Sequence, residues 1–211
     1  MFKDRRQAGD ALADALKDLK GEDLIVLAIP RGGVVVGDAV ARALGAPLDV
    51  VVTKKIGAPG EPEYAIGAVT QDGEVILDDE AVRMLGADRD YVEREAGRQA
   101  EEVRDRMRRF RGDRPVPKLK GRTVVIVDDG IATGSTVLAA ARFVKKQGPK
   151  SIVVAVPVGP AEAVARMSDE VDRVVCLETP EPFFAIGEFY SDFEQVGDDE
   201  VKRILDSYRS G

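Results

Sequence analysis

The chain has 211 residues, and its 38 acidic against 31 basic side chains give a formal net charge of −7, so nucleic acid is not the expected main partner. It contains no histidine, which excludes histidine-based catalytic triads and histidine metal ligands and leaves Mg²⁺ or Mn²⁺, held by oxygen, as the metals to expect. No apolar run approaches the roughly 20 residues of a membrane span, and the single cysteine, Cys176, excludes a disulfide framework, so we expect a small buried thiol in a cytoplasmic protein without membrane partners.

The first part of the chain alternates helical and strand patterns. Residues 5–19 carry apolar side chains at helical spacing, and 24–29 form a short, continuously apolar run that is typical of a buried parallel strand. A second helix is predicted over 34–44, ended by Gly45, and a second buried strand over 48–53.

The middle of the chain is less regular and more charged. Residues 56–63 contain too many glycines and prolines for a regular element, whereas 65–69 and 74–77 predict a hairpin. A narrow apolar stripe within the charged stretch that follows predicts a long surface helix, with a capping box from Asp90 to Glu93.

The second half returns to alternating strands and helices. They are expected at 123–128, 135–147, 151–156, 160–167 and 173–177. Strands that alternate with helices predict an α/β fold: a parallel, twisted sheet flanked by helices and joined by right-handed crossovers. The tail from Thr179 onward differs, because most of the aromatic residues lie there.

Residues 124–136 (VVIVDDGIATGST) carry the most specific chemical signal. Four apolar β-formers lead into Asp128 and Asp129, a loop of mostly small residues follows, and a helical pattern opens at Val137. The amides of Thr133 to Thr136 would lie in the first helical turn, where they lack internal acceptors and suit a phosphate. The two carboxylates can accept hydrogen bonds from ribose hydroxyls or hold a hydrated Mg²⁺. The pattern therefore predicts a phosphosugar site; the alternative is an ordinary strand–loop–helix corner with surface acids.

This segment resembles the signature of type I phosphoribosyltransferases that binds phosphoribosyl pyrophosphate (PRPP). It departs from that signature at Gly130, where the family usually has an aliphatic residue. The resemblance implies that Asp128 and Asp129 are catalytic, face the ribose and hold Mg²⁺ directly or through water. It also implies a 5-phosphate loop made of Gly130, Ile131, Ala132, Thr133, Gly134, Ser135 and Thr136.

Two further loops follow predicted strands and resemble the parts of this family that bind pyrophosphate. Arg31, Gly32 and Gly33 follow the first strand; the glycines let the backbone approach an anion, and the arginine supplies a forked cation. Lys54 and Lys55 follow the second strand, and the sequence does not separate their roles. Without the resemblance, these would be a common turn and a solvated strand end.

The whole chain, 1–211, is expected to form one phosphoribosyltransferase domain. We expect 57–117, the hairpin with the long helix, to act as a lid that excludes water, and 179–211 to form a C-terminal hood over the acceptor. In the hood, Phe183, Phe184 or Tyr190 could stack on a base while Asp192 reads its edge. An aromatic cluster that closes the core is the alternative for each of these aromatic residues.

The resemblance implies transfer of the 5-phosphoribosyl group of PRPP to a nitrogen acceptor, a purine or pyrimidine base, with Mg²⁺ and release of pyrophosphate. Ala132 stands where hypoxanthine/guanine-type enzymes carry an Asp that handles the proton of the base, so the acceptor and the source of any general acid or base, such as Glu63 or the hood, stay open. The main alternative is a regulator of the same fold that senses PRPP or a nucleotide. Homodimers are common in the resembling family, and the sequence leaves the oligomeric state open.

Overall fold

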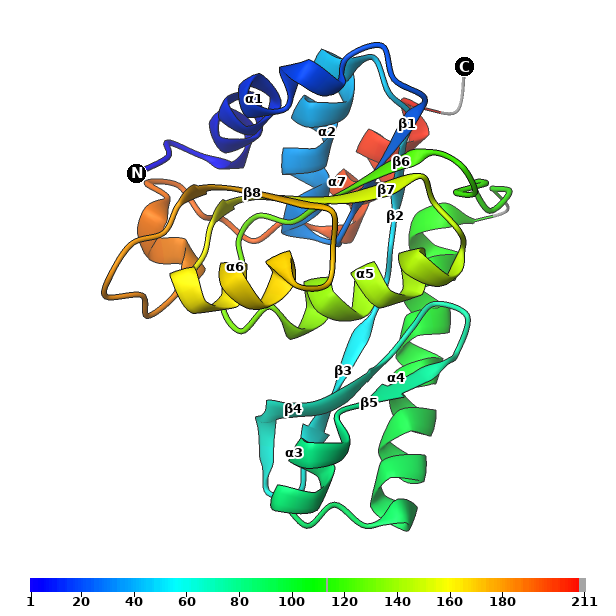
Figure 1. Ribbon diagram of the computed structural model, residues 1–211. Helices are drawn as coiled ribbons and strands as arrows, with labels where there is room; N and C mark the ends of the chain where they lie inside the picture. The colour runs from blue at the N-terminus through cyan, green and yellow to red at the C-terminus, as the bar shows by residue number, and fades with distance from the viewer. Residues whose placement is uncertain (113, 209–211) are drawn as a thin grey trace.

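The computed structural model of the protein describes residues 1–112 and 114–208, apart from the side chain of Glu63. The ranges 1–211, 57–117 and 179–211 therefore include positions outside the described residues. The centre of the molecule is a five-stranded parallel sheet in the order β2-β1-β6-β7-β8 (Figure 1). The strands are β1 (Leu24–Ala28), β2 (Leu48–Val50), β6 (Thr123–Val127), β7 (Ser151–Val158) and β8 (Arg173–Glu178).

Helices cover both faces of this sheet (Figure 1). One face carries α1 (Arg5–Ala15), the short 3₁₀ turn Lys17–Leu19, α2 (Gly32–Leu44) and α7 (Asp198–Asp206); the other carries α5 (Ser135–Lys146) and α6 (Ala161–Ser168). In β1, Val26 packs toward α1, α2 and α7, whereas Ile25 and Leu27 pack toward α5 and α6. Burial on both faces explains why the central strands β1, β6 and β7 are mostly apolar in the sequence.

The order of the strands reverses between β1 and β6. From β1 the chain moves outward to β2, and from β6 it moves the opposite way to β7 and β8. In an open parallel sheet, ligands bind outside the carboxyl ends of the strands at such a reversal. The loops after β1 and β6 lie on the two sides of this reversal. Helix α2 begins at Gly32 and not at the predicted Val34, so Gly32 and Gly33 belong to the first turn of this helix.

A smaller antiparallel sheet lies beside the main body: β3 (Lys54–Ala58), β4 (Glu61–Val69) and β5 (Val75–Leu77) (Figure 1). The β4–β5 hairpin confirms the prediction, but the irregular structure predicted for 56–63 was wrong. β3 and β4 pair through register shifts at Gly57, where a Cβ atom would lie 2.5 Å from the carbonyl oxygen of Pro62. Glycine thus allows a bulged strand pair that local propensity disfavours.

The long helix α4 (Arg89–Arg111), preceded by α3 (Asp79–Met84), joins the two parts of the molecule. Val92 and Ala96 belong to the small core with β3 and β4, whereas Val103 and Phe110 belong to the core of the main sheet. The N-cap is Asp88, whose carboxylate accepts the amide of Tyr91 at 2.7 Å, so the predicted capping box from Asp90 was wrong. Among the described residues, no helix has the length and hydrophobicity needed to cross a bilayer.

A buried ion pair anchors the end of α4 to the edge of the main sheet. Arg111 Nε donates to Asp49 Oδ1 at 3.0 Å, and its Nη2 lies 3.0 Å from Oδ2; both residues are buried. We expect Asp49→Asn to lower the free energy of unfolding by about 3–5 kcal/mol, because it leaves the guanidinium buried without a counter-charge. Urea denaturation followed by circular dichroism measures this.

The matched control is Arg89→Ala, which removes an exposed arginine paired with Glu93 on the same helix. We expect its denaturation midpoint to equal that of the unmodified protein, because solvent screens an exposed pair. Equal midpoints for Asp49→Asn and Arg89→Ala would contradict the anchoring role of the buried pair.

Candidate functional site

A cavity of about 470 Å³ opens at the reversal of strand order. Its walls come from the loops after β1 and β6, from the segment that joins β2 to β3, and from α4. The predicted site residues that line it are Arg31, Gly32, Lys54, Lys55, Asp128, Asp129, Ala132, Thr133, Ser135 and Thr136. Segments that are far apart in the sequence thus meet on one cavity.

The acid pair lies directly after β6. Asp129 donates its backbone amide to Asp128 Oδ1 at 2.8 Å, and its own Oδ2 accepts from Nε of Arg5 at 2.7 Å. The side chains of Arg5 and Asp129 are 11% and 14% exposed. Burial, followed by the neighbouring charge of Asp129, raises the pKa of Asp128 well above its usual range. The site therefore combines a carboxyl group that resists ionisation with a carboxylate held by a cation.

The glycines after β1 allow α2 to approach the acids. A Cβ atom on Gly32 would lie 1.9 Å from Asp129 Oδ2, and one on Gly33 would lie 2.9 Å from the Cα of Asp128. The Pro30–Arg31 peptide bond in this loop is cis. These Cβ distances show that the acid pair itself leaves no room for a side chain at Gly32 or Gly33. This requirement is independent of any close approach of an anion to the loop.

The predicted 5-phosphate loop leads into the first turn of α5. Gly134 precedes this helix with φ of +78°, and Ser135 is its first residue. Amides in a first helical turn have no acceptors within the helix, and the amide of Ser135 lies 3.5 Å from Oγ1 of Thr133. Thr53 donates its hydroxyl to the carbonyl of Thr136 at 3.1 Å and so ties the loop to the segment after β2.

Gly130 and Ile131 belong to the same predicted loop but are buried away from the cavity lining. A Cβ atom on Gly130 would lie 2.6 Å from Cγ2 of Ile186, in the 3₁₀ turn Ile186–Phe189 of the C-terminal segment. Glycine therefore replaces the aliphatic residue of the resembling family because an aliphatic group from another part of the chain occupies that space.

Carboxylates of neighbouring helices pair with cations of this cavity. Lys54 Nζ lies 2.5 Å from Glu102 of α4, and Arg31 Nη1 lies 3.6 Å from Asp198 of α7. Hydrogen bonding to Lys54 lowers the pKa of Glu102. Arg109, with a smaller contribution from Arg31, lowers the pKa of Asp198. An anionic ligand would meet cations that are already positioned by these carboxylates.

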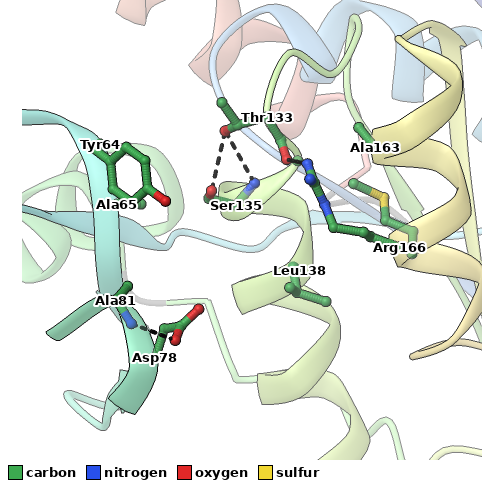
Figure 2. A pocket seen from close by; sticks show the side chains of 11 residues that line it. Tyr64, Ala65, Asp78, Ala81, Thr133, Ser135, Leu138, Ala163 and Arg166 are labelled. Atoms are coloured by element: carbon green, nitrogen blue, oxygen red, sulfur yellow. Dashed lines mark hydrogen bonds between the residues drawn. The ribbon is translucent and has the colours of Figure 1, made fainter. Parts of the chain in front are cut away.

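Figure 2 shows a second cavity, of about 330 Å³, on the other side of the phosphate loop. Tyr64 of β4 and Asp78, before α3, face the start of α5, where Ser135 lies. Arg166 of α6 donates to the carbonyl oxygen of Thr133 at 2.9 Å, which fixes the loop from this side. The loop thus separates two hollows, and Thr133 and Ser135 line both.

The predicted base-binding residues do not line the cavity over the acids. Phe183 stacks on Phe189 with ring centroids 5.2 Å apart, and Phe184 is 77% exposed. Asp192 accepts the amide of Glu194 at 3.2 Å. Phe183 thus packs within the C-terminal segment, and its base-binding role remains a prediction.

Tyr190 also has a packing role in this structure. It is 6% exposed, and its ring lies 5.6 Å from that of Phe2 and 5.0 Å from that of Phe193, measured between centroids. Its hydroxyl donates to the backbone carbonyl of Asp129 at 2.6 Å. Burial and the nearby charge of Asp129 raise the pKa of this phenol, so it remains a donor. Tyr190 therefore binds the backbone of Asp129 and does not line the cavity.

Two arginines at the site were not predicted from the sequence. Arg5 reaches the acid pair from the start of α1, and Arg106 lines the cavity from α4. Neither belongs to a local motif, since one follows the N-cap of a helix and the other lies among many charged side chains of α4. Only the spatial arrangement of these helices identifies them.

A family model described as the phosphoribosyl transferase domain matches residues 3–194. The chain belongs to this family. The resemblance seen in 124–136 is thus confirmed, as is the parallel sheet flanked by helices. Within this phosphoribosyltransferase domain, the roles of individual residues, the lid and the hood remain predictions.

Relatives agree over almost the whole chain. TT1426 from Thermus thermophilus, known from a crystal structure, is 50% identical with a TM-score of 0.87 and 98% coverage of both chains. A Mycobacterium tuberculosis H37Rv protein provisionally named a phosphoribosyl transferase is 46% identical over 206 residues, or 98% of this chain and 46% of that protein. The chain thus spans about half the length of the curated relatives it matches. The purine phosphoribosyltransferase of Pyrococcus horikoshii, at 21% identity, 92% coverage of both chains and a TM-score of 0.50, shares the fold.

The contact between Gly130 and Ile186 predicts a coupled pair of substitutions. Gly130→Ala is expected to cost about 1–3 kcal/mol of unfolding free energy through overpacking against Ile186. In the double variant Gly130→Ala/Ile186→Ala, the total loss should be smaller than the sum of the single losses by about 1 kcal/mol or more. Urea denaturation of all four proteins measures the coupling.

Gly97→Ala is the control, because a Cβ atom at this exposed helical position meets nothing within 4 Å. It should leave stability unchanged or raise it by a few tenths of a kcal/mol. Additive losses at Gly130 and Ile186 would contradict the close contact.

Cys176 provides a test by chemical labelling. Burial raises the pKa of its thiol to about 11, from 9.0 for a free group. At pH 8 the folded protein should hold about 100-fold less thiolate than the unfolded chain and react with iodoacetamide correspondingly more slowly. Labelling rates with and without urea measure this, and equal rates would contradict the burial.

Proposed function

We propose that this domain transfers the 5-phosphoribosyl group of PRPP to the nitrogen of a purine or pyrimidine base and releases pyrophosphate. The observation that carries the proposal is the convergence of three distant segments on one cavity: the Arg31–Gly32 turn after β1, Lys54 and Lys55 after β2, and the loop after β6 with its acid pair. Family membership supports the transfer chemistry, and the geometry supports the assignment of roles to these residues.

In the proposed complex, the 5-phosphate accepts hydrogen bonds from amides in the first turn of α5. The ribose hydroxyls face Asp128 and Asp129, and the pyrophosphate lies near Arg31 and Lys54 or Lys55. This orientation places both ends of an extended, anionic substrate against donors that come from different strands.

In the proposed reaction, the bond between the anomeric carbon and the pyrophosphate oxygen breaks, and its electron pair leaves with the pyrophosphate. The lone pair of the acceptor nitrogen forms the new bond to that carbon. The nitrogen then gives up its proton to a proton acceptor, the general base of the reaction. Positive charge that develops on the sugar is stabilised by the carboxylate of Asp129, and the cations stabilise the leaving group. Ala132 offers no acid or base here, and the side chain of Glu63 lies outside the described residues.

Mg²⁺ is proposed as the metal, bound together with PRPP. The donor set fits such a site, because Asp128 and Asp129 would supply hard oxygen ligands and the charge of the ion would favour the ionised form of Asp128. Among the described residues, no group of three or more acidic, cysteine or histidine side chains could hold an ion by itself. Water and the phosphate oxygens of the substrate would therefore complete the coordination, and the ion would neutralise the pyrophosphate as it leaves.

A regulator that senses PRPP or a nucleotide without transferring the sugar is the second candidate. The C-terminal segment favours it, because Phe183, Phe184, Tyr190 and Asp192 do not line the cavity over the acids. Both candidates use the same PRPP site and differ in whether an acceptor reaches it.

Release of pyrophosphate from PRPP and Mg²⁺ distinguishes the two. We expect release that depends on a base from pooled purine and pyrimidine bases, and division of the pool would identify the acceptor. If calorimetry shows PRPP binding but no base leads to pyrophosphate release, the sensor is favoured. If PRPP does not bind at all, both candidates are contradicted.

We expect Asp128→Asn and Asp129→Asn each to lower base-dependent pyrophosphate release by about 10²-fold or more while the fold is retained. The loss follows from removing a carboxyl group that faces the ribose. The far-ultraviolet circular dichroism spectrum serves as the control for folding. Full activity in the Asp128→Asn/Asp129→Asn double variant would contradict the assignment.

A further inference from the structure

Three groups hold Arg5 at once. Its Nε donates to Asp129 Oδ2 at 2.7 Å, and its Nη1 donates to the backbone carbonyl of Glu194 at 2.7 Å. The guanidinium carbon lies 3.8 Å from the centroid of the Phe193 ring. A guanidinium can bind one partner at each edge and stack its face on a ring, so this surrounding fixes its orientation fully.

The fold brings Arg5 to this place by pairing the N-terminal segment with residues 189–191. Phe2 donates its amide to the carbonyl of Phe189 and accepts from the amide of Ser191, both at 2.8 Å. The carboxylate of Asp4 accepts the amide of Gln7 at 2.8 Å, so α1 begins at Arg5. The backbone of Arg5 is thus determined on both sides.

Arg5 and Asp129 both lie against Gly32, the first residue of α2. A Cβ atom on Gly32 would lie 2.7 Å from Nε of Arg5 and 1.9 Å from Oδ2 of Asp129. Behind the acid pair, Tyr190 donates to the carbonyl of Asp129. The side chain and the backbone of Asp129 are therefore each held by one donor, and both donors lie outside the strand–loop–helix motif.

We propose that Arg5 is a positioning residue of the PRPP site, which orients the carboxylate of Asp129 toward the ribose and offsets its charge. This inference rests on the proposed function. Without Arg5, Asp129 would be free to rotate, and its uncompensated charge would repel a substrate that carries two phosphate-bearing ends. A purely structural Arg5, which only ties α1 to Glu194 and Phe193, would act on stability and not on PRPP.

The test is PRPP binding with Mg²⁺, measured by titration calorimetry on the full chain with Arg5→Gln and Arg6→Gln. The second variant is the matched control, because Arg6 is the neighbouring, exposed arginine and its loss changes the net charge equally. We expect Arg5→Gln to weaken PRPP binding about tenfold, and Arg6→Gln to weaken it less than twofold.

Each substitution is repeated in the Asp129→Asn background. If Arg5 acts through Asp129, then Arg5→Gln should weaken binding by less than threefold there. An unchanged affinity of Arg5→Gln, or the same tenfold loss in both backgrounds, would overturn the inference and leave the proposed function intact. Absence of PRPP binding by the unmodified protein would instead overturn the proposed function and the inference with it.

Arg5→Lys serves if Arg5→Gln does not fold. It keeps the charge, but a single ammonium group cannot bond both Asp129 and the carbonyl of Glu194 in the geometry of the guanidinium. We expect a folded protein whose PRPP affinity is several-fold weaker. An affinity equal to that of the unmodified protein would overturn the positioning role.

Discussion

The close approach of the loops after β1 and β6 is the constraint on which this site depends. The carboxylate of Asp129 occupies the space where any side chain on Gly32 would lie, and the first turn of α2 packs against Asp128. This contact requires two glycines on one strand end and two acids on the other. It also requires the strand order to reverse between them, because only then do both loops face a crevice that no crossover helix covers.

Charge at the site is balanced in pairs. The carboxyl of Asp128 resists ionisation, Asp129 is paired with Arg5, and Lys54 and Arg31 are paired with carboxylates of α4 and α7. In a protein with a net charge of −7, Arg31 and Lys54 are thus held at the cavity by local partners.

Helix α4 gives this domain its particular form. Its first half packs on the small antiparallel sheet, its second half packs on the main core, and Arg111 anchors its end to Asp49. Glu102 pairs with Lys54, and Arg106, in the second half of the helix, lines the cavity. The long helix of the predicted lid is therefore held to the body by packing and by a buried ion pair, and a closure that moved this helix would move these two side chains relative to the acids.

The sequence by itself determined the parallel sheet and the family, because the alternation of strands and helices and the order of residue types in 124–136 are local features of the chain. It also located the acid pair and the loop after β1, which meet on one cavity, whereas phosphate binding by 130–136 remains a prediction. Only the tertiary structure decided the rest. The pairing of β3 with β4 overrode a Gly- and Pro-rich pattern, since hydrogen bonds between strands depend on partners and not on propensity. Ile186 fills the space beside Gly130, and the buried Tyr190 donates to the backbone of Asp129. Arg5 binds Asp129, which lies 124 positions away in the sequence. Such contacts arise from packing between distant segments, and no short motif records them.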